Sequence, residues 1–189
     1  MYRFILPAVK NHLLQGLPAQ LDKTQIGHTF EGRPPAMAPS IYVSIHPQGR
    51  TNEYAAQLAM NFPFTVTITS RRECRDTAAV LPDLYFGVDD RPGVEEYVDM
   101  IIGQIHGGDN YRAIALANSI AEAIEARYPG MSGPQQTLQL LNESAPHPVT
   151  SDWWGGRHDD QNGLKVDITF GMNDHQQASQ LWAYGNPLP

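Results

Sequence analysis

The sequence contains histidine and carboxylate side chains that could in principle hold a metal ion. Imidazole and carboxylate groups are the usual protein ligands of zinc and related ions. The candidates are three histidines and acids that lie near two of them in the chain: His46, His106, His158, Asp109, Asp159 and Asp160. Their spacing follows no established metal-binding pattern. A small cytosolic metal-dependent hydrolase that uses His46, His106 and nearby acids is therefore kept as an alternative hypothesis.

Local structure explains two of these histidines without any metal. His106 precedes Gly107-Gly108 at the expected end of a helix, where a cation stabilises the helix dipole and glycine ends the helix. His158 lies in a segment rich in Gly, Asn and Asp, which are residues that turns favour. We therefore expect no metal site at either position.

The sequence also offers no activated nucleophile. Cys74 is the single cysteine, which excludes an internal disulfide framework and gives no metal-site spacing. The chain contains no Gly-x-Ser-x-Gly elbow and no Gly-rich phosphate loop. We predict a protein that is not an enzyme, with no catalytic residue and no cofactor.

An aromatic pair, Trp153-Trp154, is the most conspicuous candidate for a binding role. Adjacent residues of a strand point to opposite faces, so one indole can be buried while the other reaches outward. An outward Trp is an effective interface anchor, and two partly buried aromatics are the alternative. With neighbouring loop and tail residues, the candidate subunit or ring interface comprises Trp153, Trp154, Arg157, His158, Trp182 and Tyr184.

Two runs with a period of two, residues 40–46 and 62–71, are predicted to be paired strands at the centre of the fold. Alternation of this kind places one face in the core and one in solvent. A later run, residues 164–170, has the same period. We expect the polar face of the second run to be solvated, or to be covered by a neighbouring subunit. Its ladder comprises Thr65, Thr67 and Thr69.

Helical periodicity supplies the cover for the apolar strand faces. Apolar residues recur at helical spacing in three segments, residues 2–16, 94–105 and 111–128. The order of helix, strand pair, two helices and closing hairpin predicts an α+β fold. We expect a mixed or antiparallel sheet that is covered on one face by α-helices and carries projecting loops or arms.

The connecting segments give weaker patterns. We predict a short strand in residues 25–30 and a short strand or arm in residues 131–148. The other expected connections are a loop or helical turn at 51–60, a structured loop at 81–93, a projecting loop at 155–163 and a polar C-terminal tail at 173–189. All 189 residues are expected to form a single domain.

Composition restricts the partners. The formal net charge is −7, with 20 acidic residues against 13 Lys and Arg. This balance argues against a dedicated nucleic-acid binder, because phosphate neutralisation needs clustered basic residues. No apolar run approaches the roughly 20 residues of a membrane helix, and Met1 leads into no signal-peptide pattern. We predict a protein made and kept in a cytoplasm-like compartment, without a membrane partner.

A resemblance to a protein family rests on the strand segments. Residues 40–47 (SIYVSIHP) and 64–71 (FTVTITSR) resemble the paired strands of neck and tail-completion proteins of long-tailed bacteriophages. Later similarities are Ala117-Asn118 in a helix, the segment 152–155 (DWWG) and the strand of residues 163–171. The order of elements looks most like that of tail terminators. Head-completion or stopper rings share part of this pattern and are the nearest alternative.

The resemblance implies a structural virion protein. It would form a homohexameric ring that caps the tail tube and joins it to the head, with DNA passing through the lumen. Its partners would be other copies of itself, the tail tube protein, and head-completion or connector proteins on the portal side. It would be located in the neck of the virion, and in the host cytoplasm during assembly. We further expect loop 155–163 to contact a neighbouring subunit or ring.

Overall fold

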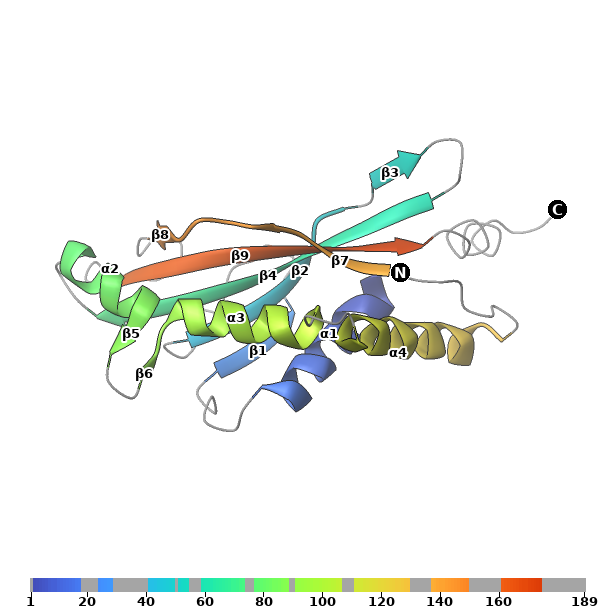
Figure 1. The fold of residues 1–189 in the computed structure, drawn as a ribbon, viewed down its shortest axis with the longest axis horizontal. Helices are drawn as coiled ribbons and strands as arrows, with labels where there is room; N and C mark the ends of the chain where they lie inside the picture. Colours follow the sequence, from blue (N-terminus) through green and yellow to red (C-terminus); the bar gives the residue numbers. More distant parts are fainter. Residues whose placement is uncertain are drawn as a thin grey trace.

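The α+β architecture predicted from the sequence is confirmed in a computed structural model of the chain (Figure 1). A seven-stranded sheet, with both parallel and antiparallel neighbours, packs its apolar face against helices. The structure describes residues 2–17, 24–28, 41–49, 51–54, 59–73, 77–88, 91–106, 111–129, 137–149 and 161–174.

Two long antiparallel strands, β4 and β9, form the middle of the sheet. They pair from Met60 opposite Asp174 to Glu73 opposite Gln161. The main path of the sheet is β1-β2-β4-β9-β7, and β3 and β8 pair with β4 and β9. Only β1 and β2 pair in parallel among the described strands. The strands are β1 (Thr24–His28), β2 (Ile41–Pro47), β3 (Thr51–Tyr54), β4 (Ala59–Glu73), β7 (Thr137–Glu143), β8 (His147–Val149) and β9 (Gln161–Asp174).

Four helices are described, and they lie in one layer and at one end of the sheet. Helices α1 (Tyr2–Gly16), α3 (Val94–Ile105) and α4 (Tyr111–Arg127) lie on one side of the sheet in Figure 1. Helix α2 (Thr77–Phe86) lies at one end, next to the small hairpin of β5 (Gly87–Val88) and β6 (Arg91–Pro92). The helix layer is therefore assembled from separate parts of the chain.

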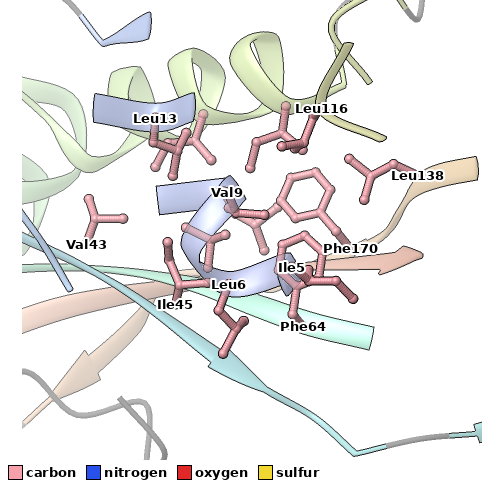
Figure 2. Close-up of a cluster of buried hydrophobic side chains, with 14 of the residues drawn as sticks. Ile5, Leu6, Val9, Leu13, Val43, Ile45, Phe64, Leu116, Leu138 and Phe170 are labelled. Carbon is pink, nitrogen blue, oxygen red and sulfur yellow. The ribbon is translucent and has the colours of Figure 1, made fainter. Parts of the chain in front are cut away.

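The core lies between this helix layer and the sheet, as the period of two predicts. Figure 2 shows Ile5, Val9 and Leu13 of α1 directed toward the strands and toward Leu116 of α4. Phe64 of β4 stacks on its cross-strand partner Phe170, with ring centroids 5.6 Å apart. Both phenylalanines are fully buried, so this pair fixes β4 and β9 against the helices.

Contacts of Tyr2 hold the start of α1 against β4 and against the turn that follows β2. The Tyr2 hydroxyl donates to the carbonyl of Pro63 at 2.7 Å and also contacts the carbonyl of Gly49. Its ring meets Phe62 edge-on at 5.8 Å. Gly49 has a φ of 96°, a conformation that favours glycine in the turn after β2. These contacts position the helix whose apolar face covers the sheet.

Two connections differ from the sequence prediction. Within residues 51–60, expected as a loop or helical turn, residues 51–54 form β3 and residues 59–60 begin β4, because tertiary pairing extends the sheet there. The residues between them lie outside the described part of the chain. Residues 81–93, expected as a loop, contain the end of α2 and the β5–β6 hairpin. Leu81, Leu84 and Tyr85 lie at helical spacing and pack against the core, which stabilises the helix although it contains Pro82.

Strand β9 also corrects the bounds of two predicted segments. Residues 161–163 of the expected loop 155–163 belong to β9, since they pair with residues 71–73 of β4. Residues 173–174 of the expected tail 173–189 pair with residues 60–61 of β4. The remaining parts of that loop and tail lie outside the described residues. The short strand predicted within residues 25–30 is confirmed over residues 25–28 of β1. For residues 131–148, expected as a short strand or an arm, β7 confirms the strand, and the start of β8 adds a second one.

No helix in the described part of the chain is both long and apolar enough to cross a bilayer.

Removal of the Phe64 ring should destabilise the protein far more than removal of an exposed ring. Phe64→Ala deletes a fully buried aromatic, and we expect a loss of about 3–5 kcal/mol in the free energy of unfolding. Phe86→Ala, at a site 68% exposed, should cost less than about 0.5 kcal/mol. Denaturant unfolding at low protein concentration measures both. Equal losses in the two variants would contradict this description of the core.

Candidate functional site

The sheet face opposite the helices carries a row of polar side chains across three strands. Because Phe64, Val66 and Ile68 face the core, the alternate residues of β4 face the other way. Cross-strand pairing places Ser44 and Asp167 on either side of Thr67, and His46 and Thr169 on either side of Thr65. This polar face brings hydroxyl, imidazole and carboxylate side chains of β2, β4 and β9 next to one another.

Hydrogen bonds connect the row into a chain. The Thr67 hydroxyl donates to Asp167 Oδ1 at 2.6 Å and lies 3.0 Å from His46 Nε2. Because that hydroxyl has one hydrogen, it accepts from His46, which therefore carries its proton on Nε2. Lys165 Nζ lies 3.0 Å from Asp167 Oδ2 and forms an ion pair with it. The imidazole, hydroxyl, carboxylate and ammonium groups are thus each bonded to the next in space.

The neighbouring hydroxyls are paired in the same way. Gln48 Nε2 donates to Thr65 Oγ1 at 2.8 Å, and Thr65 Oγ1 lies 3.1 Å from Thr169 Oγ1. Thr69 donates to the carbonyl of Tyr42 at 3.2 Å. Each threonine of the β4 ladder therefore bonds to a group on β2 or β9, and Thr65 bonds also to Gln48, which directly follows β2.

The prediction that this ladder is solvated is wrong. Thr65, Thr67 and Thr69 are each no more than 2% exposed, and Ser44 is fully buried. Burial of a hydroxyl is costly only when its hydrogen bonds are lost, and here the three threonine hydroxyls are bonded. The ladder is already buried within one copy of the chain, so it needs no neighbouring subunit to cover it.

The environment of His46 favours the neutral form of its imidazole. Burial is the main cause that lowers the pKa of His46 below its usual value of 6.5, and Lys165 lowers it further. Asp167 opposes these effects by favouring the imidazolium. On the same face, burial raises the pKa of Tyr42. The environment thus favours the uncharged forms of both side chains.

The network fixes strand register and is poorly arranged for catalysis. The hydroxyl of Thr67 is committed to Asp167 and almost completely buried, so it is not available for attack on a substrate. The same bonds join β2, β4 and β9 through side chains as well as backbone. We interpret this face as a buried polar layer of the sheet.

The structure does not bring His46 and His106, the two candidate metal-binding histidines that it describes, together. His46 lies on the polar face of the sheet, whereas His106 follows the end of α3 in the helix layer. Within the described ranges, no three His, Cys, Asp or Glu side chains form a group that could hold a metal ion. The remaining candidates, Asp109, His158, Asp159 and Asp160, lie outside the described residues.

The six residues predicted to form a subunit or ring interface also lie outside the described part of the chain. They are Trp153, Trp154, Arg157, His158, Trp182 and Tyr184, and their interface role stays a prediction. Cys74 lies outside it too.

Sequence analysis missed a different set of surface residues. Large apolar side chains are exposed at Leu14, Phe86, Val88, Ile114, Leu140 and Leu141. A signal was present for some of them. Leu14 directly follows Leu13, which is the last buried residue of α1. Phe86 follows Tyr85 in a segment with several acids. Exposed apolar residues of this kind indicate protein contact surfaces when they gather in one place.

No protein-family model matches the chain, and no curated protein sequence matches it either.

His46 should make stability depend on pH. Its pKa is lower in the folded state than in the unfolded state, so the unfolded chain binds the proton more readily. This contribution is present above the unfolded pKa of about 6.5 and is lost as the pH falls through the folded pKa. In His46→Gln, the free energy of unfolding should therefore decline less between pH 7.5 and 5 than in the wild type. Urea unfolding across that range measures the slope, with His147→Gln as the matched loss of an imidazole. An unchanged slope in His46→Gln would contradict the prediction.

The Thr67 hydroxyl should stabilise the sheet through its two bonds. Thr67→Val keeps the shape but leaves Asp167 and His46 without this partner, which should cost about 1–3 kcal/mol of unfolding free energy. Thr67→Ser keeps the hydroxyl and should retain most of the stability, apart from a lost methyl group. Denaturant unfolding compares the two variants. A valine variant more stable than the serine variant would show that the polar chain does not stabilise the fold.

Proposed function

We propose that the chain is a structural protein of a bacteriophage neck, a tail terminator that forms a homohexameric ring. The ring caps the tail tube and joins it to the head, and DNA passes through its lumen. The chain acts in the virion and is present in the host cytoplasm during assembly. Its partners are other copies of itself, the tail tube protein and a head-side connector protein.

The placement of exposed apolar side chains at separate parts of the surface carries this proposal. Phe86 and Val88 lie around the end of α2, Leu14 and Ile114 lie on α1 and α4, and Leu140 and Leu141 lie on β7. A closed ring needs two different surfaces on each copy, because each copy contacts its two neighbours head to tail. Several separate apolar surfaces are what such an assembly requires.

The segments that carry the family resemblance support the same proposal. Residues 40–47 contain all of β2, and residues 64–71 form the centre of β4. The two strands pair antiparallel from Ile41 opposite Ser70 to Pro47 opposite Phe64. The paired strands that the resemblance implies are thus neighbours at the centre of the sheet. Helices then cover one face, as in the arrangement expected for this family.

The charge of the chain suits a passage for DNA. A formal net charge of −7 disfavours tight contact with phosphates, so DNA could move through the lumen without being held.

The alternative, a hydrolase that uses His46 and His106, gains no support from their positions on different layers of the fold. A stopper ring remains the nearest competitor and is distinguished by its binding partner.

The test is the mass of the purified protein, alone and on tail tubes. Light scattering should give a mass of six chains, or electron microscopy should show a ring on one end of purified tubes. Bovine serum albumin at equal concentration controls for non-specific binding to tubes. A monomer that ignores tubes would contradict the terminator proposal, and binding to portal complexes instead would identify a stopper.

A further inference from the structure

Two surfaces at opposite ends of α3 combine exposed apolar side chains with charges of opposite sign. We call the first the acidic tip, defined by Phe86, Val88, Glu95, Glu96 and Asp99. We call the second the basic face, defined by Lys10, Leu14, Arg112 and Ile114. Figure 1 shows that α3 runs between α2 at one end and the start of α4 at the other.

The acidic tip is formed where α2 meets the start of α3. Phe86 is 68% exposed although it packs edge-on against Tyr85, with ring centroids 4.9 Å apart. The backbone of Gly93 lies so close to the backbone of Tyr85 and Phe86 that a Cβ would overlap them. The acids of the first turn of α3, Glu95 and Glu96, therefore follow directly beside the aromatic pair.

The basic face is formed where the ends of α1 and α3 meet the start of α4. Gln104 donates to the carbonyl of Gly16 at 2.7 Å, and Arg112 donates to the carbonyl of Gly103 at 2.7 Å. Leu14 and Ile114 lie two residues from these contacts, and both are more than half exposed. Lys10 precedes Leu14 by four residues, so the two share a face of α1.

The sign of each surface comes from the charged residues at that end of α3. Helices α2 and α3 carry Asp83, Glu95, Glu96 and Asp99 and no lysine or arginine. The hairpin between them contributes Arg91, which pairs with Val88, so these four acids outnumber that base. At the basic face, α1 contributes Lys10 and α4 contributes Arg112 of its first turn. Arg3 lies beside Tyr128 at the other end of α4, and the acids Glu122 and Glu125 of α4 lie ten or more residues beyond Arg112. An apolar centre with charges of one sign complements an apolar centre with charges of the other.

These surfaces cannot meet within one copy of the chain. Helix α3 has 12 residues and therefore spans about 18 Å between them. Each surface can pair only with its complement on another molecule. A contact between two different surfaces of identical chains is heterologous, and it closes into a ring when the rotation between copies allows.

We propose that the acidic tip of one copy docks on the basic face of the next copy, with Phe86 and Val88 against Leu14 and Ile114. This contact rests on the proposed ring function and names its subunit interface. Charge complementarity selects a second copy as the occupant, because the chain itself carries both halves. Glu95 and Glu96 would lie opposite Lys10 and Arg112.

Cysteine cross-linking tests the contact directly. In a Cys74→Ser background, Val88→Cys and Ile114→Cys are made as separate variants and then mixed under mild oxidation. We expect a disulfide-linked dimer in the mixture and much less in either variant alone. A single chain with both cysteines should give a ladder of linked copies. Cross-linking of Val88→Cys with itself, at a yield equal to that of the mixture, would overturn the heterologous pairing.

Charge reversal provides a second measurement that does not depend on new cysteines. The variants Glu95→Lys with Glu96→Lys, and Lys10→Glu with Arg112→Glu, should each raise the apparent dissociation constant of assembly by about tenfold or more. The chain with all four changes should recover assembly. Thermal unfolding checks that every variant folds. Assembly that is unaffected by either reversal would overturn the contact.

The outcomes separate this inference from the proposed function. Rings that form without the cross-link would overturn the contact and leave the ring proposal standing. A cross-link in a protein that ignores tail tubes would support the contact and overturn the terminator role. A wild type that stays monomeric with and without tubes, and gives no cross-link, would overturn both. Binding of the acidic tip to the tube protein alone would assign that surface to a different partner.

Discussion

The pairing of β4 with β9 is the constraint on which the rest of the structure depends. These are the two longest strands, and their register sets which side chains face the helices. A slip of one residue would turn Lys165 and Asp167 into the core and expose Val166 and Ile168. The stacked pair Phe64 and Phe170 on one face and the bond from Thr67 to Asp167 on the other both require the observed register. Each face therefore reinforces the alignment that the other needs.

The two faces of the sheet stabilise the register of β4 and β9 through different interactions. The helix-facing side is stabilised by removal of apolar surface from water, which is strong but tolerant of small shifts. The opposite side uses hydrogen bonds from Thr65, Thr67 and Thr69, which require specific positions of their partners. Both faces are therefore buried at the centre of the sheet, whereas the exposed apolar residues lie on helices α1, α2 and α4, on β5 and on the edge strand β7.

Periodicity was sufficient to predict the central strands, three of the helices and the fold class, because each of these elements has one apolar and one polar side. Periodicity did not predict the segments whose secondary structure depends on tertiary contacts. Residues 51–54 become β3 only because β4 extends beside them, and α2 is held by the contacts of Leu81, Leu84 and Tyr85. Burial of the threonine ladder depends on hydrogen bonds between strands, which no local pattern reveals. The interface candidates around Trp153 stay predictions. Leu14 and Phe86 were missed because isolated apolar residues resemble ordinary surface variation. Ile114 was expected on the apolar face of its helix from its spacing with Ala117 and Ile124, but it is more than half exposed.

The charges around α3 have an explanation within one chain, and this separates them from the apolar residues beside them. Glu95 and Glu96 lie at the helix N-terminus, where the dipole favours anions, and Arg112 bonds to the carbonyl of Gly103 near its C-terminus. These charges would stabilise α3 even in a monomer. Phe86, Leu14 and Ile114 gain no comparable benefit, because each leaves more than half of its surface in water. The contact that we propose between copies would account for their exposure, and the charges that stabilise α3 would then also select which surface of the neighbour each apolar patch meets.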